Sequence, residues 1–302
     1  MKSTRKNKLV SVIIPAYNEE KVIRNCLESL EKQSYRSLEV IVVDDGSTDQ
    51  TTTIIGNWKL PARLAFGNSK AGGEIGNLTL LKQSHLGPGP ARNLGASIAK
   101  GETLVFVDAD MTFDKDFIKD LTKPIIEGEM IGTFSKNEFV ANKDDIWSKC
   151  WNMNRGWQND RLFTKNSPDT SPVFRAISKK EFDKVKGFDS HGEYTDDWSL
   201  SEKLNKKAIL VRGAIYYHSN PSTLIEVWKQ AKWFSTNKFI SGNLWRKVKS
   251  LVFYSLPMSL TIGLFKGVKS KMPIFVLFKI WFDLAVWHTV LKSLFTSKKI
   301  LK

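Results

Sequence analysis

Asp108 and Asp110 are the two carboxylates of this chain whose spacing and position best suit the binding of a cation. They come directly after the apolar run 103–107, which has the composition of a buried β-strand, so both stand where that strand ends. Paired carboxylates at such a position can hold one hard divalent cation, which in turn neutralises a diphosphate. An Asp-x-Asp sequence is also common in solvated turns, so the prediction of a metal site depends on its place after a buried strand.

A second acidic cluster, residues 44–49, follows the apolar run 38–43 in the same way. One interpretation is a turn in which Ser47 or Thr48 caps the next helix. That interpretation does not exclude binding, because a carboxylate at a strand end is well placed to accept hydrogen bonds from a nucleobase or a ribose.

The stretch 87–93, Gly-Pro-Gly-Pro-Ala-Arg-Asn, leads into a predicted helix. Its small residues let a ligand approach the backbone, and the N-terminus of a helix attracts phosphate. Arg92 is expected to add charge-assisted hydrogen bonds to that phosphate. The alternative is an ordinary loop that carries a surface arginine.

The elements that must position these residues alternate between strand and helix. Buried strands are predicted at 8–15, 38–43, 78–81 and 103–107, and helices at 19–32, 48–55 and 90–100, the last with a proline near its start. This alternation predicts an α/β fold with a mostly parallel, doubly wound sheet. Further strands are predicted near 131–134, 171–177 and 208–212, and an amphipathic helix at 224–239. Because ligands bind at the carboxyl ends of such strands, the clusters 15–19, 44–49 and 108–110 are expected to meet at one edge.

The formal net charge of +15 is confined to the last third of the chain. Residues 1–202 hold 28 Lys and Arg against 29 Asp and Glu, whereas residues 203–302 hold 18 against 2. Such a basic block favours a polyanion, either nucleic acid or an anionic lipid surface.

The two cysteines, Cys26 and Cys150, fit no metal-ligand spacing and are expected to be reduced structural thiols. Residues 9–15 are too short for a secretory apolar segment.

The apolar content of the last sixty residues decides between the two polyanions. Residues 250–265 form an uncharged run of 16 with lysine clusters on both sides, shorter than the about 20 residues that span a bilayer. The longer run 272–295 contains Lys279 and Asp283, which are spaced to pair along a helix. Apolar bulk between lysines favours an anionic membrane surface at the cytoplasmic face, in a peripheral or monotopic arrangement, over nucleic acid. The alternative is a pair of helices packed on the preceding domain, and the predicted domains are 1–242 and 243–302.

Five segments together resemble glycosyltransferase family 2, whose members have the GT-A fold. They occur in the order and spacing of that family: VSVIIPAYNEE, EVIVVDDGSTD, GPGPARNLGASIAKGE, LVFVDAD and FDKVKGFDSHGEYTDDWSLSEKL. The resemblance covers roughly residues 9–240. It implies an inverting transferase that uses a UDP- or GDP-linked sugar, a divalent metal (Mn²⁺ or Mg²⁺) and a lipid-linked or glycan acceptor, including the acceptors of cell-envelope polysaccharide synthesis.

The resemblance also implies roles for individual positions. The residues expected to line the nucleotide pocket are Pro15, Tyr17 and Glu19, with Asp45 near the base or ribose. Asp108 would lie by the ribose and the metal, with Asp110 as a direct metal ligand.

The same resemblance assigns the acceptor side. Asp197 matches the general base, and Asp196 stands where a glutamate is common. His218 matches a histidine that approaches the metal or the diphosphate in some members, although a lone histidine after an apolar run is more often a satisfied core residue.

One element of the family is altered. Processive members carry a Gln-x-x-Arg-Trp sequence, whereas residues 229–233 of this chain read Lys-Gln-Ala-Lys-Trp. This departure predicts a single sugar addition, with Lys232 either near the diphosphate or on a solvated basic helix face. Two other functions stay open at this point: a non-catalytic membrane-binding protein on a degenerate GT-A fold, and a nucleotidyltransferase that uses the same metal site.

Overall fold

The chain forms two compact units in a computed structural model that describes residues 8–58, 78–158, 160–163, 166–189, 196–239 and 243–295. The first unit comprises residues 1–139 and 165–218, and the second comprises residues 140–164 and 219–302. This division differs from the predicted boundary after residue 242. The helices Ile146–Arg155 and Leu224–Phe239 lie on the N-terminal side of that boundary but belong with the C-terminal helices, because their apolar faces pack against those helices.

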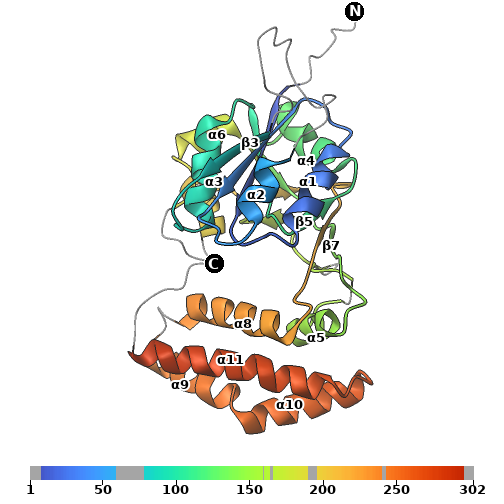
Figure 1. The fold of residues 1–302 in the computed structure, drawn as a ribbon, viewed down its shortest axis with the longest axis vertical. Helices are drawn as coiled ribbons and strands as arrows, with labels where there is room; N and C mark the ends of the chain where they lie inside the picture. The colour runs from blue at the N-terminus through green and yellow to red at the C-terminus, as the bar shows by residue number, and fades with distance from the viewer. Residues whose placement is uncertain are drawn as a thin grey trace, which may run out of the picture. The chain divides into compact units, whose positions relative to one another are not determined.

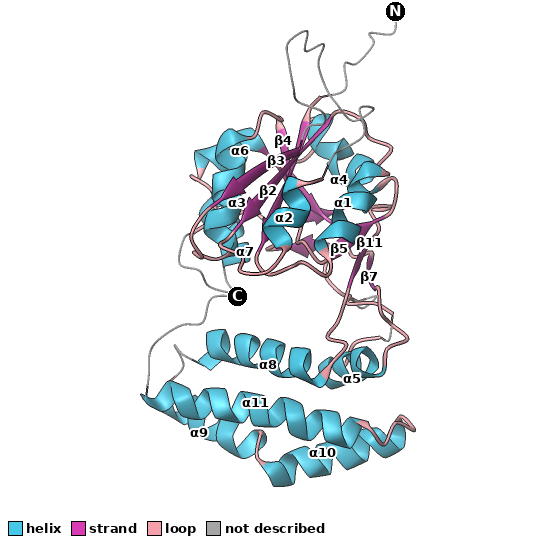
Figure 2. Ribbon diagram, viewed as in Figure 1, coloured by secondary structure: helices cyan, strands magenta, loops and turns pink. Residues whose placement is uncertain are grey.

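The first unit is built on an eight-stranded sheet in the order β3-β2-β1-β4-β9-β6-β10-β8. Figures 1 and 2 draw this sheet and its helices as a ribbon. Four parallel strands make up one half of it: β1 (Val10–Ala16), β2 (Leu38–Asp44), β3 (Leu78–Lys82) and β4 (Thr103–Phe106). The other half is mixed: β9 (Ala176–Ser178) runs antiparallel to β4 and β6 (Gly132–Phe134), β10 (Ala208–Leu210) is parallel to β6, and β8 (Thr170–Ser171) is antiparallel to β10. The predicted α/β class is confirmed.

Helices cover both faces of this sheet. On one face pack α1 (Ile23–Glu31), α2 (Thr51–Gly56) and α4 (Phe117–Ile126); on the other pack α3 (Pro88–Ile98), α6 (Lys179–Lys184) and α7 (Asp196–Leu204). Consecutive residues of β1 therefore enter different cores, Ile13 with α3 and Ile14 with α1. Burial on both faces explains why the parallel strands are continuous apolar runs in the sequence.

A small second sheet follows β4. Its strands, in the order β5-β11-β7, are β5 (Met111–Phe113), β11 (Tyr216–His218) and β7 (Glu138–Val140). β5 and β11 are antiparallel, with His218 opposite Met111. None of the three strands of this small sheet was predicted, because each is only three residues long and lies outside the apolar runs that indicated the other strands.

The second unit is helical: α5 (Ile146–Arg155), α8 (Leu224–Phe239), α9 (Leu244–Phe253), α10 (Leu256–Lys269) and α11 (Phe275–Phe295). α11 contacts each of the other four. Its Lys279 and Asp283 pair at 2.6 Å, as their spacing predicts, and both are buried. Among the described helices none is by itself long and apolar enough to cross a membrane; α9 and α10, bent by 53°, pass that test only as a pair.

Candidate active site

Asp108 and Asp110 lie where the chain passes from the large sheet to the small one. β4 ends at Phe106, β5 begins at Met111, and the Met111 N–H donates to the Asp108 carbonyl at 3.2 Å. The intervening turn leaves Asp108 at the carboxyl edge of the parallel strands and Asp110 at the start of the small sheet. The two predicted carboxylates therefore stand at the strand end, and each has its own set of cationic neighbours.

The small sheet brings His218 to Asp110. The β5–β11 register places the His218 Nε2 atom 3.0 Å from an Asp110 carboxylate oxygen, and its Nδ1 atom 3.4 Å from Glu138 of β7. Burial alone would lower the pKa of His218, but the Asp110 carboxylate and the hydrogen bonds to Asp110 and Glu138 raise it to about 10. Glu138 also accepts a hydrogen bond of 2.9 Å from the Tyr216 hydroxyl. Glu138 thus orients the His218 ring toward the Asp110 carboxylate.

The chemistry of these donors fits a divalent cation in part. Asp110 supplies a carboxylate oxygen, which suits Mn²⁺, and His218 adds an imidazole nitrogen only when a bound cation has displaced its proton. Within the described residues, however, no three His, Cys, Asp or Glu side chains gather as a full set of ligands. Two protein ligands are nevertheless enough for a cation of the Mg²⁺ type, which completes its shell with water and substrate phosphates.

Arg92 joins Asp108 to Asp197. Its guanidinium donates to Asp108 at 2.8 Å and, through the other terminal nitrogen, to Asp197. The side chain is 6% exposed, whereas that of Asp197 is 39% exposed. Burial would lower the pKa of Arg92, but the Asp197 and Asp108 carboxylates raise it above its usual value. Two carboxylates from distant stretches of sequence therefore share one buried cation.

Asn93, next to Arg92 on α3, holds the turn that leads toward α7. Its amide donates to the Phe188 carbonyl at 2.9 Å and accepts from the Phe188 N–H at 2.8 Å. Gly187 in this turn has φ +72°, and a Cβ there would lie 2.3 Å from the Asn93 side chain. The turn thus needs glycine, and its Asp189 N–H donates to Ser199 Oγ of α7 at 3.1 Å. Asp196 opens α7, but its side chain lies outside the described residues.

Arg175 is a site residue that sequence analysis missed. It precedes β9, its carbonyl accepts from the Phe106 N–H at the end of β4, and its guanidinium lies 3.4 Å from the second Asp108 oxygen. Burial opposes its charge, but Tyr216, Asp108 and Glu138 raise the pKa of Arg175 above its usual value. A lone arginine inside the apolar run 173–177 was the available signal, because a buried arginine needs carboxylate partners.

The loops after β1 and β2 are tied together beside this edge. The Glu19 N–H donates to Thr51 Oγ1 at 2.8 Å, and Asn18, which follows Tyr17, exchanges hydrogen bonds with Ser47 and Thr48. Pro15 is the last but one residue of β1. The predicted nucleotide-pocket residues therefore stand on one connected set of loops.

Tyr17 and His85 form a stacked pair above Asp45. Their ring centroids are 3.9 Å apart with planes 17° from parallel, and the His85 Nδ1 atom lies 2.8 Å from an Asp45 carboxylate oxygen. That carboxylate also accepts from Gln83 and from the N–H groups of Leu86 and Gly87, at 2.6–2.9 Å. Asp45 is 2% exposed, so in this structure it organises the loop before α3. Its predicted contact with a base or ribose stays a prediction.

The N-terminus of α3 has few N–H groups to offer a phosphate. Pro88 and Pro90 carry none, the Gly87 N–H donates to Asp45, and the Ala91 N–H donates to the Gly87 carbonyl. Arg92, which was expected to bind phosphate, is held by two carboxylates instead. Its predicted phosphate contact stays a prediction, as does that of Lys232, which lies on α8 in the second unit.

Comparison with protein families and with curated proteins gives consistent matches. The model of glycosyl transferase family 2 matches residues 11–186. Glycosyltransferase GlyG of Streptococcus pneumoniae serotype 4 is 32% identical over 234 residues, which cover 72% of each chain. Glycosyltransferase GlyA of the same organism is 27% identical over 243 residues, 74% of this chain but 32% of GlyA. The match therefore spans about a third of that longer relative.

Solved structures show the same fold. The mannosyltransferase PcManGT from Pyrobaculum calidifontis, in complex with GDP-Man and Mn²⁺, aligns with a TM-score of 0.59 over 95% of this chain and 88% of its own, at 20% identity. Staphylococcus aureus TarS 1–349, in complex with UDP-GlcNAc, aligns with a TM-score of 0.54 over 95% and 91%, at 19% identity. At these identities the likeness concerns the fold alone, and it is the GT-A fold.

Proposed function

Because the chain belongs to glycosyltransferase family 2 and has the GT-A fold of a sugar-nucleotide-dependent transferase, we propose that it adds one sugar, with inversion, to a hydroxyl or phosphate acceptor. The match to the family and to proteins named glycosyltransferases favours this activity over the nucleotidyltransferase and non-catalytic alternatives.

The observation that carries the proposal is the Arg92 bridge between Asp108 and Asp197. Inverting transfer needs a base on one side of the sugar and stabilisation of the leaving diphosphate on the other. The bridge holds a carboxylate from each side in one cluster. The 39% exposure of Asp197 leaves it open to an acceptor hydroxyl, from which it would take the proton as the bond to the anomeric carbon forms.

On the donor side, Asp110 and His218 are the residues that would hold a divalent cation. When bound, such a cation would stabilise the charge that develops on the departing diphosphate. The Mn²⁺ and GDP-Man of the PcManGT structure and the UDP-GlcNAc of the TarS structure support a UDP- or GDP-linked donor. Tyr17 and His85 offer a flat aromatic surface for its base.

We further propose that the acceptor is lipid-linked or a growing glycan of the cell envelope, and that the second unit meets the cytoplasmic face of the membrane. Residues 140–164 and 219–302 hold 18 Lys and Arg against 5 Asp and Glu. On α9 and α10, every fourth residue is apolar and exposed, a set that we call the apolar stripe: Leu244, Val248, Val252, Leu256, Leu260, Leu264 and Val268. An apolar face among lysines suits the interface of an anionic bilayer.

Asp197→Asn tests the assigned base. Asparagine can still accept from Arg92 but cannot take a proton, so turnover should fall by roughly 10²–10⁴-fold, with donor binding retained. Asp183→Asn is the matched control, because Asp183 is a 55% exposed carboxylate on α6 that pairs only with Lys179 in the described part of the chain. Near-normal turnover of Asp197→Asn would show that another group is the base.

A donor screen tests the activity more broadly. We expect calorimetry with UDP- and GDP-linked sugars to detect binding in Mn²⁺ or Mg²⁺, and chelation with EDTA to remove it. Binding that survives chelation unchanged would argue against the metal, and no binding of any donor would argue against the proposed reaction.

A further inference from the structure

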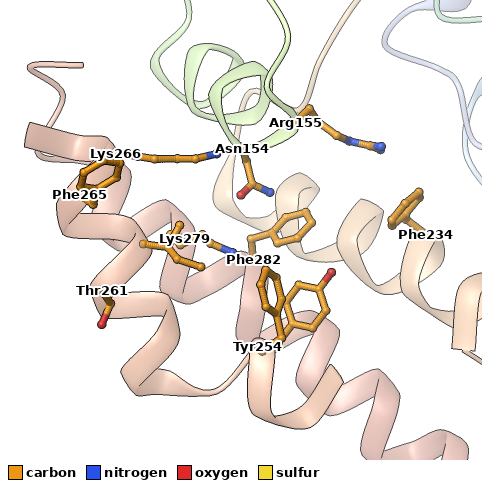
Figure 3. Close-up of a pocket in the computed structure, with 11 residues that line it drawn as sticks. Asn154, Arg155, Phe234, Tyr254, Thr261, Phe265, Lys266, Lys279 and Phe282 are labelled. Atoms are coloured by element: carbon orange, nitrogen blue, oxygen red, sulfur yellow. The ribbon is translucent and has the colours of Figure 1, made fainter. Parts of the chain in front are cut away.

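A cavity of about 640 Å³ lies among the five helices of the second unit (Figure 3). Its size falls within the range of small-molecule sites, roughly 300–1,000 Å³. Five aromatic rings line it: Phe234, Phe253, Tyr254, Phe265 and Phe282. A cavity with such walls is suited to an apolar group much larger than a simple ion.

Three cationic side chains reach the same cavity: Arg155 of α5, Lys266 of α10 and Lys279 of α11. The charge of Lys279 is already balanced by an ion pair with Asp283, which also accepts a 2.7 Å hydrogen bond from Ser259. None of the described residues that line the cavity carries a carboxylate. The cavity therefore combines apolar walls with an excess of positive charge.

Lys266 of α10 is the cation of this lining that we consider for an anionic ligand. Its ammonium donates to the Met153 carbonyl at 3.1 Å, and Figure 3 shows the side chain extended toward Asn154. Throughout the described ranges it has no carboxylate within ion-pair distance. Burial and the neighbouring Lys279 ammonium lower the pKa of Lys266 below its usual value. An anion beside it would offset both effects.

We propose that this cavity binds the phosphate headgroup of an anionic membrane lipid, with Lys266 on the phosphate and the aromatic rings against the glycerol and the first methylene groups. A free phosphate would leave the aromatic walls without contacts. Phe253 and Phe265, which line the cavity, are 49% and 69% exposed on the same helices as the apolar stripe. A lipid can thus lie with its head in the cavity and its chains along that stripe. The inference rests on the proposed meeting of the second unit with a membrane.

The direct test needs no membrane. The full chain is titrated by calorimetry with dihexanoyl phosphatidic acid below its micelle concentration, with dihexanoylglycerol, and with inorganic phosphate. Phosphatidic acid should bind much more tightly than either of the others. Equal binding of inorganic phosphate would overturn the lipid in favour of a free-phosphate site, and no binding of phosphatidic acid would overturn the inference.

Three variants assign the site. Lys266→Gln should weaken phosphatidic acid binding by roughly 10–100-fold, the loss of one charge-assisted hydrogen bond, whereas Lys266→Arg should retain it. Lys269→Gln is the matched control, because Lys269 is exposed on the same helix, carries the same charge and lies outside the cavity lining. Equal weakening by Lys266→Gln and Lys269→Gln would show a diffuse charge effect and overturn the inference. Unchanged melting temperatures would verify that each variant is folded.

Vesicles separate this inference from the proposed function. Sedimentation with vesicles of equal parts phosphatidylcholine and phosphatidylglycerol, against phosphatidylcholine alone, measures the meeting with the membrane. Failure to sediment would overturn the membrane proposal. The titration with soluble phosphatidic acid would still test whether the cavity binds the lipid. Donor binding should be the same in Lys266→Gln and the unchanged chain, so a donor that fails to bind either of them counts against the transferase proposal alone.

Discussion

Replacing Arg92 with methionine removes the cation that Asp108 and Asp197 share. Methionine keeps most of the side-chain volume, so packing beside the Phe188 ring, now 5.6 Å from the guanidinium, is largely preserved. The two carboxylates would lose their common partner and repel each other. Asp197 would also lose the contact that fixes its position on α7.

The magnitude follows from the two hydrogen bonds that are lost. Each charge-assisted bond contributes about 1.5–3 kcal/mol. Water can solvate the carboxylates left behind, because Asp108 is 27% and Asp197 39% exposed, and this reduces the loss. We expect the free energy of unfolding to fall by about 2–4 kcal/mol, a large part of the 5–15 kcal/mol of a typical domain. Turnover should fall by roughly 10²-fold or more, because a base displaced by 1 Å loses that much.

The assay pairs urea denaturation with sugar transfer measured at a temperature where every variant is folded. Arg36→Met is the control, because Arg36 is an exposed surface arginine. Arg92→Lys should lie between the two, since a compact ammonium cannot reach both carboxylates with the geometry of a guanidinium. Turnover within threefold of the unchanged chain in Arg92→Met would refute the idea that the bridge positions the base.

Three further changes test the framework of the site. Asp49→Asn should lose about 0.5–1 kcal/mol of stability at neutral pH. Hydrogen bonds to Asp49 lower its pKa in the folded protein despite its burial. The stability difference is therefore present above the pKa of the unfolded state, and in denaturation curves measured at acid pH it should vanish as the pH falls through the folded-state pKa. Gly95→Ala should destabilise by about 1–3 kcal/mol, because its Cβ would lie 2.6 Å from the Ile13 side chain, whereas Gly56→Ala, with nothing within 4 Å, should be neutral or stabilising in the same urea titration. Asp45→Asn should cost about 2–3 kcal/mol, because an amide cannot accept from all four donors, and an unchanged urea midpoint would contradict the loop-organising role of that carboxylate.

The parallel half of the fold was predictable because its physics is local. Strands buried on both faces must be continuous apolar runs, and β1, β2 and β4 begin and end within two residues of the predicted ranges. The same reasoning placed three polar clusters at their carboxyl ends. The loops after β1 and β2 are indeed joined by hydrogen bonds, and Asp108 stands at the end of β4.

The partners of the site carboxylates were only partly predictable. The resemblance assigned both Asp110 and His218 to the metal, and the structure brings these two side chains together. Glu138, which contacts His218, was not identified, because it lies on a strand of three residues whose pairing depends on the rest of the fold. Arg175 reaches Asp108 from the residue before β9, an antiparallel strand far along the chain. Composition likewise gave a boundary at residue 242, whereas α5 and α8 pack with the C-terminal helices because their apolar faces match that core.

The first turns of α3 show how one sequence motif acquires a different use from the one its residue types indicate. Glycine and proline before an arginine are typical of a loop that cradles phosphate. Here the prolines remove N–H groups, Asp45 takes the one on Gly87, and Arg92 and Asn93 each tie down a separate stretch of chain. One helix therefore links the loop after β2, the end of β4 and the turn before α7. If α3 has this organising role, Asn93→Ala should disturb Asp197 through the 187–189 turn and so lower turnover. The affinity for the donor should be retained, because Asn93 contacts neither Asp108 nor Asp110 among the described interactions. A loss confined to donor affinity would instead show that the motif binds phosphate.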